Sequence, residues 1–249
     1  SPPHVKEGSP PRKTHPIRAQ ATKATAFFGT IARSARPLPR SSFCAGKFTK
    51  TVIESFQRRE EVVPVIDSKN FPIQVDGEIT LKLAELEDAE VLFELVEENR
   101  AYLQEWLSWV PDVKSVADQK ESIRQGIQGL AKGRGIALNI IYLGEIVGCI
   151  GVHSIYLPYQ RGEIAYWLAK SATRTGIATR SCEALIRYAF EILGLHRIEI
   201  RCVPENTRSS AIPKRLGFTY EGTLKEAVLL NGCYVDQEVY RLLEQEWHK

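Results

Sequence analysis

The sequence contains no methionine at any of its 249 positions, the first included, which indicates that the chain as given is trimmed, processed or altered. It has no run approaching about 18 consecutive apolar residues, which excludes a membrane-spanning protein. No pair of its five cysteines stands at C-x-x-C spacing or at ligand spacing from a histidine, which disfavours a disulfide scaffold and a structural zinc site. A reducing compartment and a soluble globular class fit best, since 43% of residues are apolar and 25% are charged.

Acidic residues are scarce in the first part of the chain. Residues 1–70 hold 13 lysines and arginines against 5 acids, whereas residues 71–249 hold 20 against 25, so the net charge of +3 conceals two parts of opposite sign. A Ser/Pro/Arg-rich stretch with little apolar periodicity buries too little surface to offset its ordering entropy. We therefore expect a basic, largely disordered arm at 1–70 and one folded domain at 71–249.

Three interpretations of the basic arm compete. Its composition is typical of an organelle transit peptide, rich in Arg and Ser and poor in acids. An upstream translated segment without function explains it equally well. A tail that binds nucleic acid or an acidic surface is weaker, because the basic residues are not interleaved with a stacking motif. We expect no membrane or specific nucleic-acid partner and a cytoplasmic location, with an organelle as the alternative if residues 1–70 are a transit segment.

After Pro72 the hydrophobic pattern is that of a compact mixed domain. Alternating apolar residues predict strands, and apolar residues at a 3.6-residue period predict helices. The expected strands are 78–84, 136–143, 146–156, 163–168, 197–203, 218–229 and 235–243, with Gly144-Glu145 as a hairpin turn. The expected helices are 88–99, 115–133, 176–193 and 206–216, with Pro213 near the first turn of the last. This order predicts an α+β fold with a mostly antiparallel sheet and helices on both faces.

The junction at residues 173–178 carries the clearest chemical signal. It links a strand to a helix N-terminus, where unpaired main-chain N–H groups and the positive dipole end form an anion site. Gly176 lets the main chain approach a phosphate, Ala178 leaves the first turn unobstructed, and Arg174 adds a cation. The segment is neither a Walker A loop nor a Rossmann glycine fingerprint, so a pyrophosphate in another setting is expected.

Four segments in this order resemble the GNAT acetyltransferases. They are residues 163–169, 173–179, 188–201 and 205–218, and the resemblance covers roughly 71–247. It is strongest to the RimJ/RimL branch, which acetylates ribosomal-protein N-termini, and in particular to its YdaF-like members. The resemblance implies a GNAT fold in which two central parallel strands, here 163–169 and 197–203, splay apart. It also implies acetyl-CoA as the acetyl donor and no metal.

The resemblance assigns cofactor contacts to three places in the chain. Main-chain groups of Leu168 and Ala169 would meet the pantetheine arm. The pyrophosphate would be held by main-chain amides of the loop and first helical turn, which comprise Arg174, Thr175, Gly176, Ile177, Ala178 and Thr179. Asn206 would contact the cofactor from the next helix, and a role as helix N-cap is compatible with the same position.

The implied reaction is direct attack of an uncharged amine on the thioester carbonyl. Ser209 matches the serine that the family is proposed to use as proton donor to the thiolate, although a serine in a first helical turn often bonds only main chain. Main-chain N–H groups around Ala169 would bind the oxyanion. The glutamate that the branch has three residues before Asn-Gly is Val228 here, and valine accepts no proton. Glu226, Glu163 or a water molecule acting on a partly neutral α-amine are the alternatives.

The acceptor is the least defined part of the site. Tyr234 and Asp236 match a segment of the branch that lines the acceptor site, and a strand end with a satisfied carboxylate explains them slightly better. The expected acceptor is a primary amine, either a ribosomal-type protein N-terminus or a small amine, and a homodimer stays open. The alternative function is an acetyl-CoA-binding sensor or interaction protein with little or no turnover.

Overall fold

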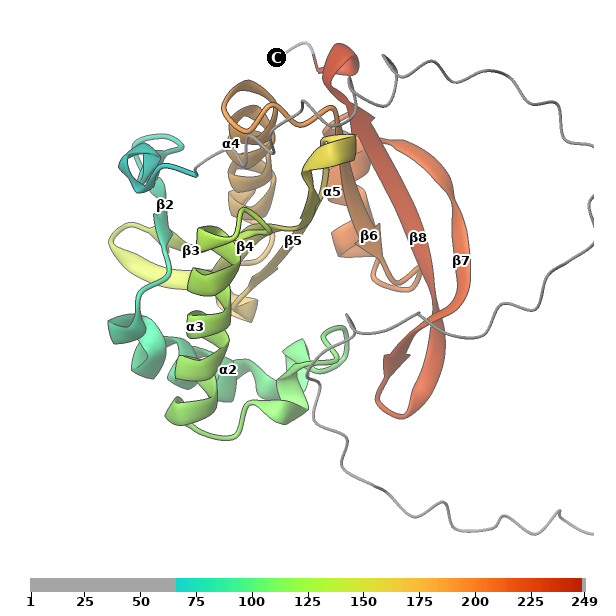
Figure 1. Ribbon diagram of the computed structural model, residues 1–249. Helices are drawn as coiled ribbons and strands as arrows, with labels where there is room; N and C mark the ends of the chain where they lie inside the picture. Colours follow the sequence, from blue (N-terminus) through green and yellow to red (C-terminus); the bar gives the residue numbers. More distant parts are fainter. Residues whose placement is uncertain (1–65, 248–249) are drawn as a thin grey trace, which may run out of the picture. The chain divides into compact units, whose positions relative to one another are not determined.

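The computed structural model describes residues 66–247 (Figure 1). Nearly all of the basic arm, with its expected disorder, lies outside these residues. Within residues 66–247 the chain forms one eight-stranded mixed sheet and four α-helices. None of the helices in this part of the chain is long and apolar enough to cross a membrane.

Seven of the eight strands and all four α-helices were predicted; the two-residue strand at Ile73–Gln74 was not, and the first helix continues to Leu103, beyond its predicted end at 99. The strands are β1 (Ile73–Gln74), β2 (Ile79–Leu83), β3 (Ile136–Tyr142), β4 (Glu145–Tyr156), β5 (Arg161–Leu168), β6 (Arg197–Cys202), β7 (Thr219–Leu230) and β8 (Cys233–Leu243). The helices are α2 (Ala89–Leu103), α3 (Val116–Ala131), α4 (Ile177–Glu191) and α5 (Thr207–Arg215), and a short 3-10 turn, η5 (Lys170–Ala172), precedes α4. The predicted α+β class is confirmed.

The sheet has one parallel contact, at its centre. Its order is β1-β2-β3-β4-β5-β6-β8-β7, which Figure 1 shows from left to right between β2 and β7. Neighbouring strands are antiparallel, except that β5 and β6 are parallel. These two strands pair over three residues each, Arg161–Glu163 of β5 with Arg197–Glu199 of β6. Beyond these three residues, β5 and β6 form no further pairs with each other. The splayed parallel pair that the resemblance implied is therefore confirmed.

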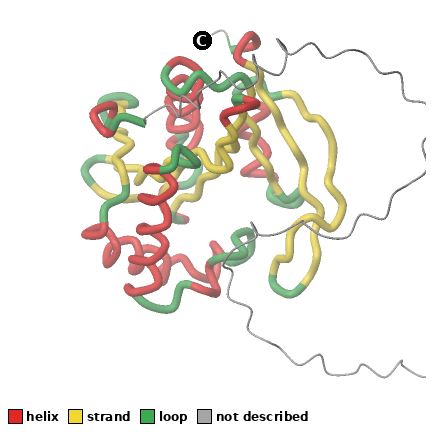
Figure 2. Tube along the Cα trace, in the orientation of Figure 1, coloured by secondary structure: helices red, strands yellow, loops and turns green. Residues whose placement is uncertain are grey.

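Helices cover both faces of the sheet. Side chains alternate between faces along a strand, and in β4 Ile150 belongs to the main core with Leu185 and Ile186 of α4. Its neighbour Cys149 points the other way and packs with the α2 and α3 residues. Figure 2 shows α2 and α3 together on one side of the strands and α4 on the other. The largest cluster of buried side chains therefore lies between α4 and the sheet.

Two local predictions need correction. The β3–β4 turn consists of Leu143 and Gly144, since Tyr142 pairs with Glu145 across it. Both turn residues have positive φ, 51° and 92°, as a two-residue type I′ turn requires. Pro213 is the seventh residue of α5 and lies in its second turn, not near its first.

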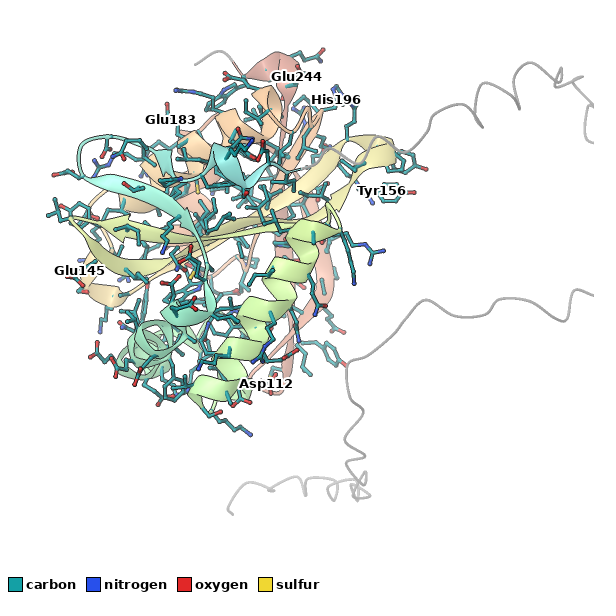
Figure 3. All side chains as sticks on the ribbon, turned by 60° about the vertical axis from the view of Figure 1, so that its left-hand side comes forward. Asp112, Glu145, Tyr156, Glu183, His196 and Glu244 are labelled. Carbon is teal, nitrogen blue, oxygen red and sulfur yellow. The ribbon has the colours of Figure 1, made fainter. Side chains whose placement is uncertain are left out.

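Strand β4 spans the domain, and the strands beside it position the site. Glu145 and Tyr156, at its two ends, lie on opposite sides of the molecule in Figure 3. At the sheet edge, β7 and β8 form a long hairpin with a bulge, because β7 residues 225–227 lie opposite Asp236 alone. At the hairpin tip, Asn231 Nδ2 donates to the Gln104 carbonyl at 2.9 Å, which joins the hairpin to the end of α2.

Candidate functional site

A cavity of 670 Å³ lies at the point where β5 and β6 part. Its walls come from four segments: the end of α2 with the residues after it, the end of β5, the loop and first turn of α4, and α5. Of the residues predicted for the cofactor, those that line it are Leu168, Arg174, Gly176, Ile177, Ala178, Thr179 and Asn206. Ser209 also lines the cavity. The structure therefore brings most of the predicted cofactor site together with the predicted proton donor.

The N-terminus of α4 faces this cavity with its amides uncapped. Gly176 is the N-cap residue, with φ of 82°, and it has no side chain that could accept a hydrogen bond. The first amide with a helical partner is that of Arg180, which donates to the Gly176 carbonyl at 3.0 Å. The three amides before it are available to an anion, and the helix dipole adds to their attraction.

Four arginines and no carboxylate are among the cavity-lining residues. Arg180 is occupied by ion pairs to Asp76 and Glu78. Arg215 donates to the Thr179 hydroxyl at 2.8 Å. The other two are Arg174 and Arg208, for which no ion pair occurs among residues 66–247. A concave site with an uncapped helix N-terminus and unpaired guanidinium groups is suited to a phosphate-bearing ligand.

Threonines brace the loop that precedes α4. The Thr173 hydroxyl donates to the Lys170 carbonyl at 2.7 Å, and the Thr175 hydroxyl donates to the Ala172 carbonyl at 2.8 Å. Thr175 does not line the cavity. These two side-chain to main-chain bonds fix the turn that leads into α4.

The oxyanion prediction shifts by one residue. The Ala169 amide donates to the Val147 carbonyl of the neighbouring chain segment at 2.8 Å, so it is not available to a ligand. Main-chain donors alternate in direction along an antiparallel strand. Because Ala169 points towards β4, the Leu168 amide points towards the gap beside β6. Leu168 is thus the main-chain donor that the splay leaves open.

Ser209 lies in the first turn of α5 with a polar partner on each side. Its amide donates to Asn206 Oδ1 at 3.1 Å, so Asn206 is the N-cap of α5 and lines the cavity at the same time. The Ser209 hydroxyl is 3.3 Å from the Tyr166 hydroxyl and 3.3 Å from Cys202 Sγ. Burial raises the pKa of the Cys202 thiol to about 11, so this group stays protonated near neutral pH.

Two predicted bases lie away from the cavity. The Glu163 carboxylate lies 3.4 Å from Arg201 Nε and 3.8 Å from His153 Nε2. Glu163 does not line the cavity. Glu226 lies in the β7 bulge with φ of 49° and is exposed. Within residues 66–247 the partners of the Ser209 hydroxyl are Tyr166 and Cys202, and neither carboxylate is among them. Val228 pairs with Val235 in the hairpin, and neither side chain can accept a proton.

The two predicted acceptor residues also lie outside the cavity lining. Asp236 accepts from the Lys225 ammonium at 2.7 Å and from the Glu226 amide at 3.1 Å, so its carboxylate closes the bulge. These bonds hold the pKa of Asp236 below its usual value. Tyr234 is 67% exposed near the hairpin tip. The satisfied-carboxylate explanation fits Asp236 better than a role in binding.

A second hollow of 390 Å³ adjoins the first, and sequence patterns did not reveal it. The two share residues of α2 and α5, among them Tyr102 and Asn206. The second hollow adds two carboxylates, Glu105 and Glu205, and the cation Lys170. Glu105 and Glu205 come from segments far apart in the chain, so no local pattern could indicate that they face one space.

Some other missed residues did leave a signal. Arg208 and Arg215 are seven residues apart, which places them on one face of α5, with Ala211 between them. This spacing was the signal that could have placed both arginines beside the anion site. Tyr166 left none, because an aromatic residue in a strand is typical of any sheet.

Comparisons with known proteins agree with this geometry. The family model described as "Acetyltransferase (GNAT) domain" matches residues 78–219. The chain is 36% identical over 178 residues to the putative ribosomal N-acetyltransferase YdaF of Bacillus subtilis (strain 168), covering 71% of this chain and 97% of that protein. It is 29% identical over 175 residues to the ribosomal-protein-serine acetyltransferase of Escherichia coli (strain K12), covering 70% and 98%.

Solved structures give the same result. A RimL ribosomal-protein α-N-acetyltransferase in complex with coenzyme A superposes with a TM-score of 0.68 at 28% identity, covering 70% of this chain and 99% of that one. The microcin C7 self-immunity acetyltransferase MccE, in complex with acetyl-CoA and AMP, superposes with a TM-score of 0.67 at 30% identity, covering 73% and 99%.

Proposed function

This chain belongs to the GNAT acetyltransferase family and is an N-acetyltransferase that uses acetyl-CoA, and we propose that its acceptor is the α-amino group of a protein N-terminus. Two of its relatives are named for acetylation of ribosomal proteins. The relatives are named as transferases, which favours turnover over a sensor. The proposed location is the cytoplasm, with an organelle as the alternative if residues 1–70 act as a transit segment.

The observation that carries the acceptor proposal is that carboxylates line the second hollow and not the first. The first is lined by four arginines, whereas the second contains Glu105 and Glu205 together with Lys170 and Arg208. An anionic cofactor suits the first hollow, and the two carboxylates of the second suit a cationic ammonium. Because the hollows share Tyr102, Trp106 and Asn206, the two reactants can meet at their boundary.

The residues of the first hollow are assigned to parts of acetyl-CoA as follows. The uncapped amides of α4 and Arg174 bind the pyrophosphate, and Arg208 and Arg215 provide further charge for phosphate. The gap between β5 and β6 takes the pantetheine arm beside the main chain of Leu168. This arrangement directs the thioester towards Ser209 and the second hollow.

Each chemical task then has an assigned group. The amine nitrogen forms a bond to the acetyl carbon as the carbon–sulfur bond breaks, so the amine loses a proton and the thiolate gains one. The Leu168 amide stabilises the oxyanion, and the Ser209 hydroxyl donates to the thiolate. An α-amine has a pKa near 8 and is partly neutral at physiological pH, so a water held by Glu105 or Glu205 suffices as base.

The test is the position at which acetyl is added to a peptide with a free N-terminus and one internal lysine. We expect mass spectrometry to find the acetyl group on the α-amine, because the ε-amine has a higher pKa and is almost fully protonated. The same peptide with a blocked α-amine is the control and should remain unmodified. Acetylation of the lysine in both peptides would contradict the proposed acceptor.

A pair of variants tests the acidic hollow in the same assay. Glu205→Gln should raise KM for the peptide several-fold and leave acetyl-CoA affinity unchanged, since it removes one charge facing the ammonium. Glu98→Gln is the matched control, because Glu98 is exposed on α2 and lines neither hollow. Equal KM values in the two variants would move the acceptor elsewhere.

A further inference from the structure

The main-chain carbonyl of Ser209 lacks its helical hydrogen bond. In an α-helix the carbonyl of residue i accepts from the amide of residue i+4, which here is Pro213. Proline has no N–H group, so this bond cannot form. Pro213 is buried inside α5, and the Ser209 carbonyl must find another donor or remain unsatisfied at a cost.

Tyr166 supplies that donor from a different element. Its hydroxyl lies 3.1 Å from the Ser209 carbonyl oxygen, and a carbonyl can only accept, so the phenol is the donor. Burial raises the pKa of Tyr166 well above its usual value, and the phenol remains protonated throughout the physiological range. The phenol therefore keeps the proton that it donates to the Ser209 carbonyl.

This hydrogen bond crosses the gap between the splayed strands. Tyr166 lies three residues past Glu163, the last residue of β5 that pairs with β6. At this level no ladder bond joins β5 to β6, and α5 follows directly after β6. The Tyr166–Ser209 bond consequently links β5 to α5, and both residues line the cavity.

We propose that Tyr166 is a positioning residue for Ser209, holding its main chain through the carbonyl that Pro213 leaves free, so that the hydroxyl faces the thioester sulfur. Asn206 holds the amide of Ser209 and Tyr166 holds its carbonyl, so both ends of the residue are fixed. The inference rests on the proposed role of Ser209 as proton donor. It predicts that loss of the Tyr166 hydroxyl slows turnover, and that the effect is smaller when the Ser209 carbonyl has another hydrogen-bond donor.

The first experiment compares Tyr166→Phe with the wild-type full chain. The ring is kept and one hydrogen bond to a part-buried carbonyl is lost, so we expect kcat to fall about tenfold. The Kd of acetyl-CoA, measured by calorimetry, should stay within about twofold. In a Ser209→Ala background the same substitution should cause no further loss of kcat, because the positioned hydroxyl is already absent.

The decisive experiment restores the missing amide at residue 213. Pro213→Ala supplies an N–H group four residues after Ser209, so its carbonyl has a helical donor without Tyr166. The loss of kcat caused by Tyr166→Phe should shrink from about tenfold to less than about threefold in the Pro213→Ala background. An equal loss in both backgrounds, or unchanged kcat in Tyr166→Phe alone, would overturn the proposal.

The rescue by Pro213→Ala must be distinguished from a loss of folding and from failure of the proposed acceptor. Thermal unfolding of all variants shows whether each is folded. Comparing kcat with and without Tyr166→Phe in the same background removes any effect of Pro213→Ala itself. The assay uses whichever amine the wild-type chain acetylates. Failure of peptide acceptors therefore contradicts the proposed acceptor, whereas absence of rescue contradicts the role of Tyr166.

Discussion

Arg174 adopts a left-handed main-chain conformation, with φ of 68°, although it carries a Cβ. Such conformations cost free energy in non-glycine residues and persist where the surroundings impose them. Two residues on, Gly176 has φ of 82°. Thr175 between them has no positive φ. Loops in which right-handed and left-handed residues follow one another turn successive main-chain amides towards one point, which is how phosphate-binding nests form. The strained residue Arg174 thus lies in the part of the loop that lines the cavity.

Reversal of the charge at Arg174 should weaken cofactor binding. We expect Arg174→Glu to raise the Kd of acetyl-CoA at least about tenfold, because a carboxylate replaces a guanidinium beside the phosphates. Isothermal calorimetry measures the change. Arg187→Glu is the control, since Arg187 is exposed on α4 but outside the cavity. Equal affinities in the two variants would place the phosphates elsewhere.

Single residues differ in how far their roles follow from sequence. Gly176 and Asn206 were predictable, because a glycine before a helix and an asparagine N-cap act through local main-chain geometry. The proposed base was not, since the expected position holds Val228, and Glu105 and Glu205 line one hollow only through folding. Tyr166 was equally hidden, because its partner carbonyl is exposed by a proline in another element.

At the scale of elements, β3 and β4 approach each other closely at Gly151. A Cβ at this position would lie 2.3 Å from the Ile136 carbonyl oxygen, which is main chain and cannot move aside. We expect Gly151→Ala to lower the free energy of unfolding by about 2–3 kcal/mol, as measured by urea denaturation. A change smaller than that of an ordinary surface substitution would show that the strands are not held at this distance.

A glycine in α3 is the matched control. A Cβ at Gly129 would meet nothing within 4 Å, and the residue lies in the last turn of the helix without a positive φ. Gly129→Ala should therefore raise the free energy of unfolding by up to about 1 kcal/mol, because alanine loses less main-chain entropy in a helix. The opposite signs of the two glycine substitutions separate steric contact from conformational preference.

Seven strands and all four helices were predicted because each has a clear period, whereas β1 has two residues and is too short to show one. Other errors lie where strand geometry changes. The hairpin turn at Leu143 and Gly144 was predicted one residue late, and the β7 bulge at 225–227 was not predicted. A bulge depends on what stands opposite, here the bonds from Asp236 to Lys225 and to the Glu226 amide. That partner is invisible in the alternation of β7 alone.

Across the molecule, charged side chains form a connected network on one face of the central strands. Glu199 is 8% exposed and accepts from Arg197 at 2.9 Å and from Arg201 at 2.8 Å. Arg197 also pairs with Glu221, which lies near Arg241. Burial disfavours the charged carboxylate, but hydrogen bonds from the two arginines outweigh it and hold the pKa of Glu199 below its usual value.

Acid should weaken the fold in part through Glu199. Because its folded pKa is depressed, its stabilisation is fully present above the unfolded pKa of about 4.3 and is lost as pH falls through the folded pKa. We expect Glu199→Gln to lower the free energy of unfolding at neutral pH by about 1–3 kcal/mol and to reduce its decline on acidification. Urea denaturation between about pH 7 and about pH 3 measures both effects.

An exposed pair on α3 provides the control for Glu199. Glu121 is 56% exposed and lies 3.2 Å from Arg124, so Glu121→Gln should change stability by less than about 0.5 kcal/mol. The free energy of unfolding of Glu199→Gln could instead fall with acid as steeply as that of the wild type. In that case the network does not contribute to the pH dependence of stability.

The most direct test of the central claim is steady-state release of CoA by the full chain with acetyl-CoA and a panel of amines. The panel contains peptides with free N-termini, the same peptides with blocked N-termini, polyamines, aminoglycosides and amino acids. We expect the free peptides to stimulate release and their blocked counterparts to leave it at the background rate. Tight binding of acetyl-CoA without release for any amine, or release stimulated only by small amines, would contradict the account.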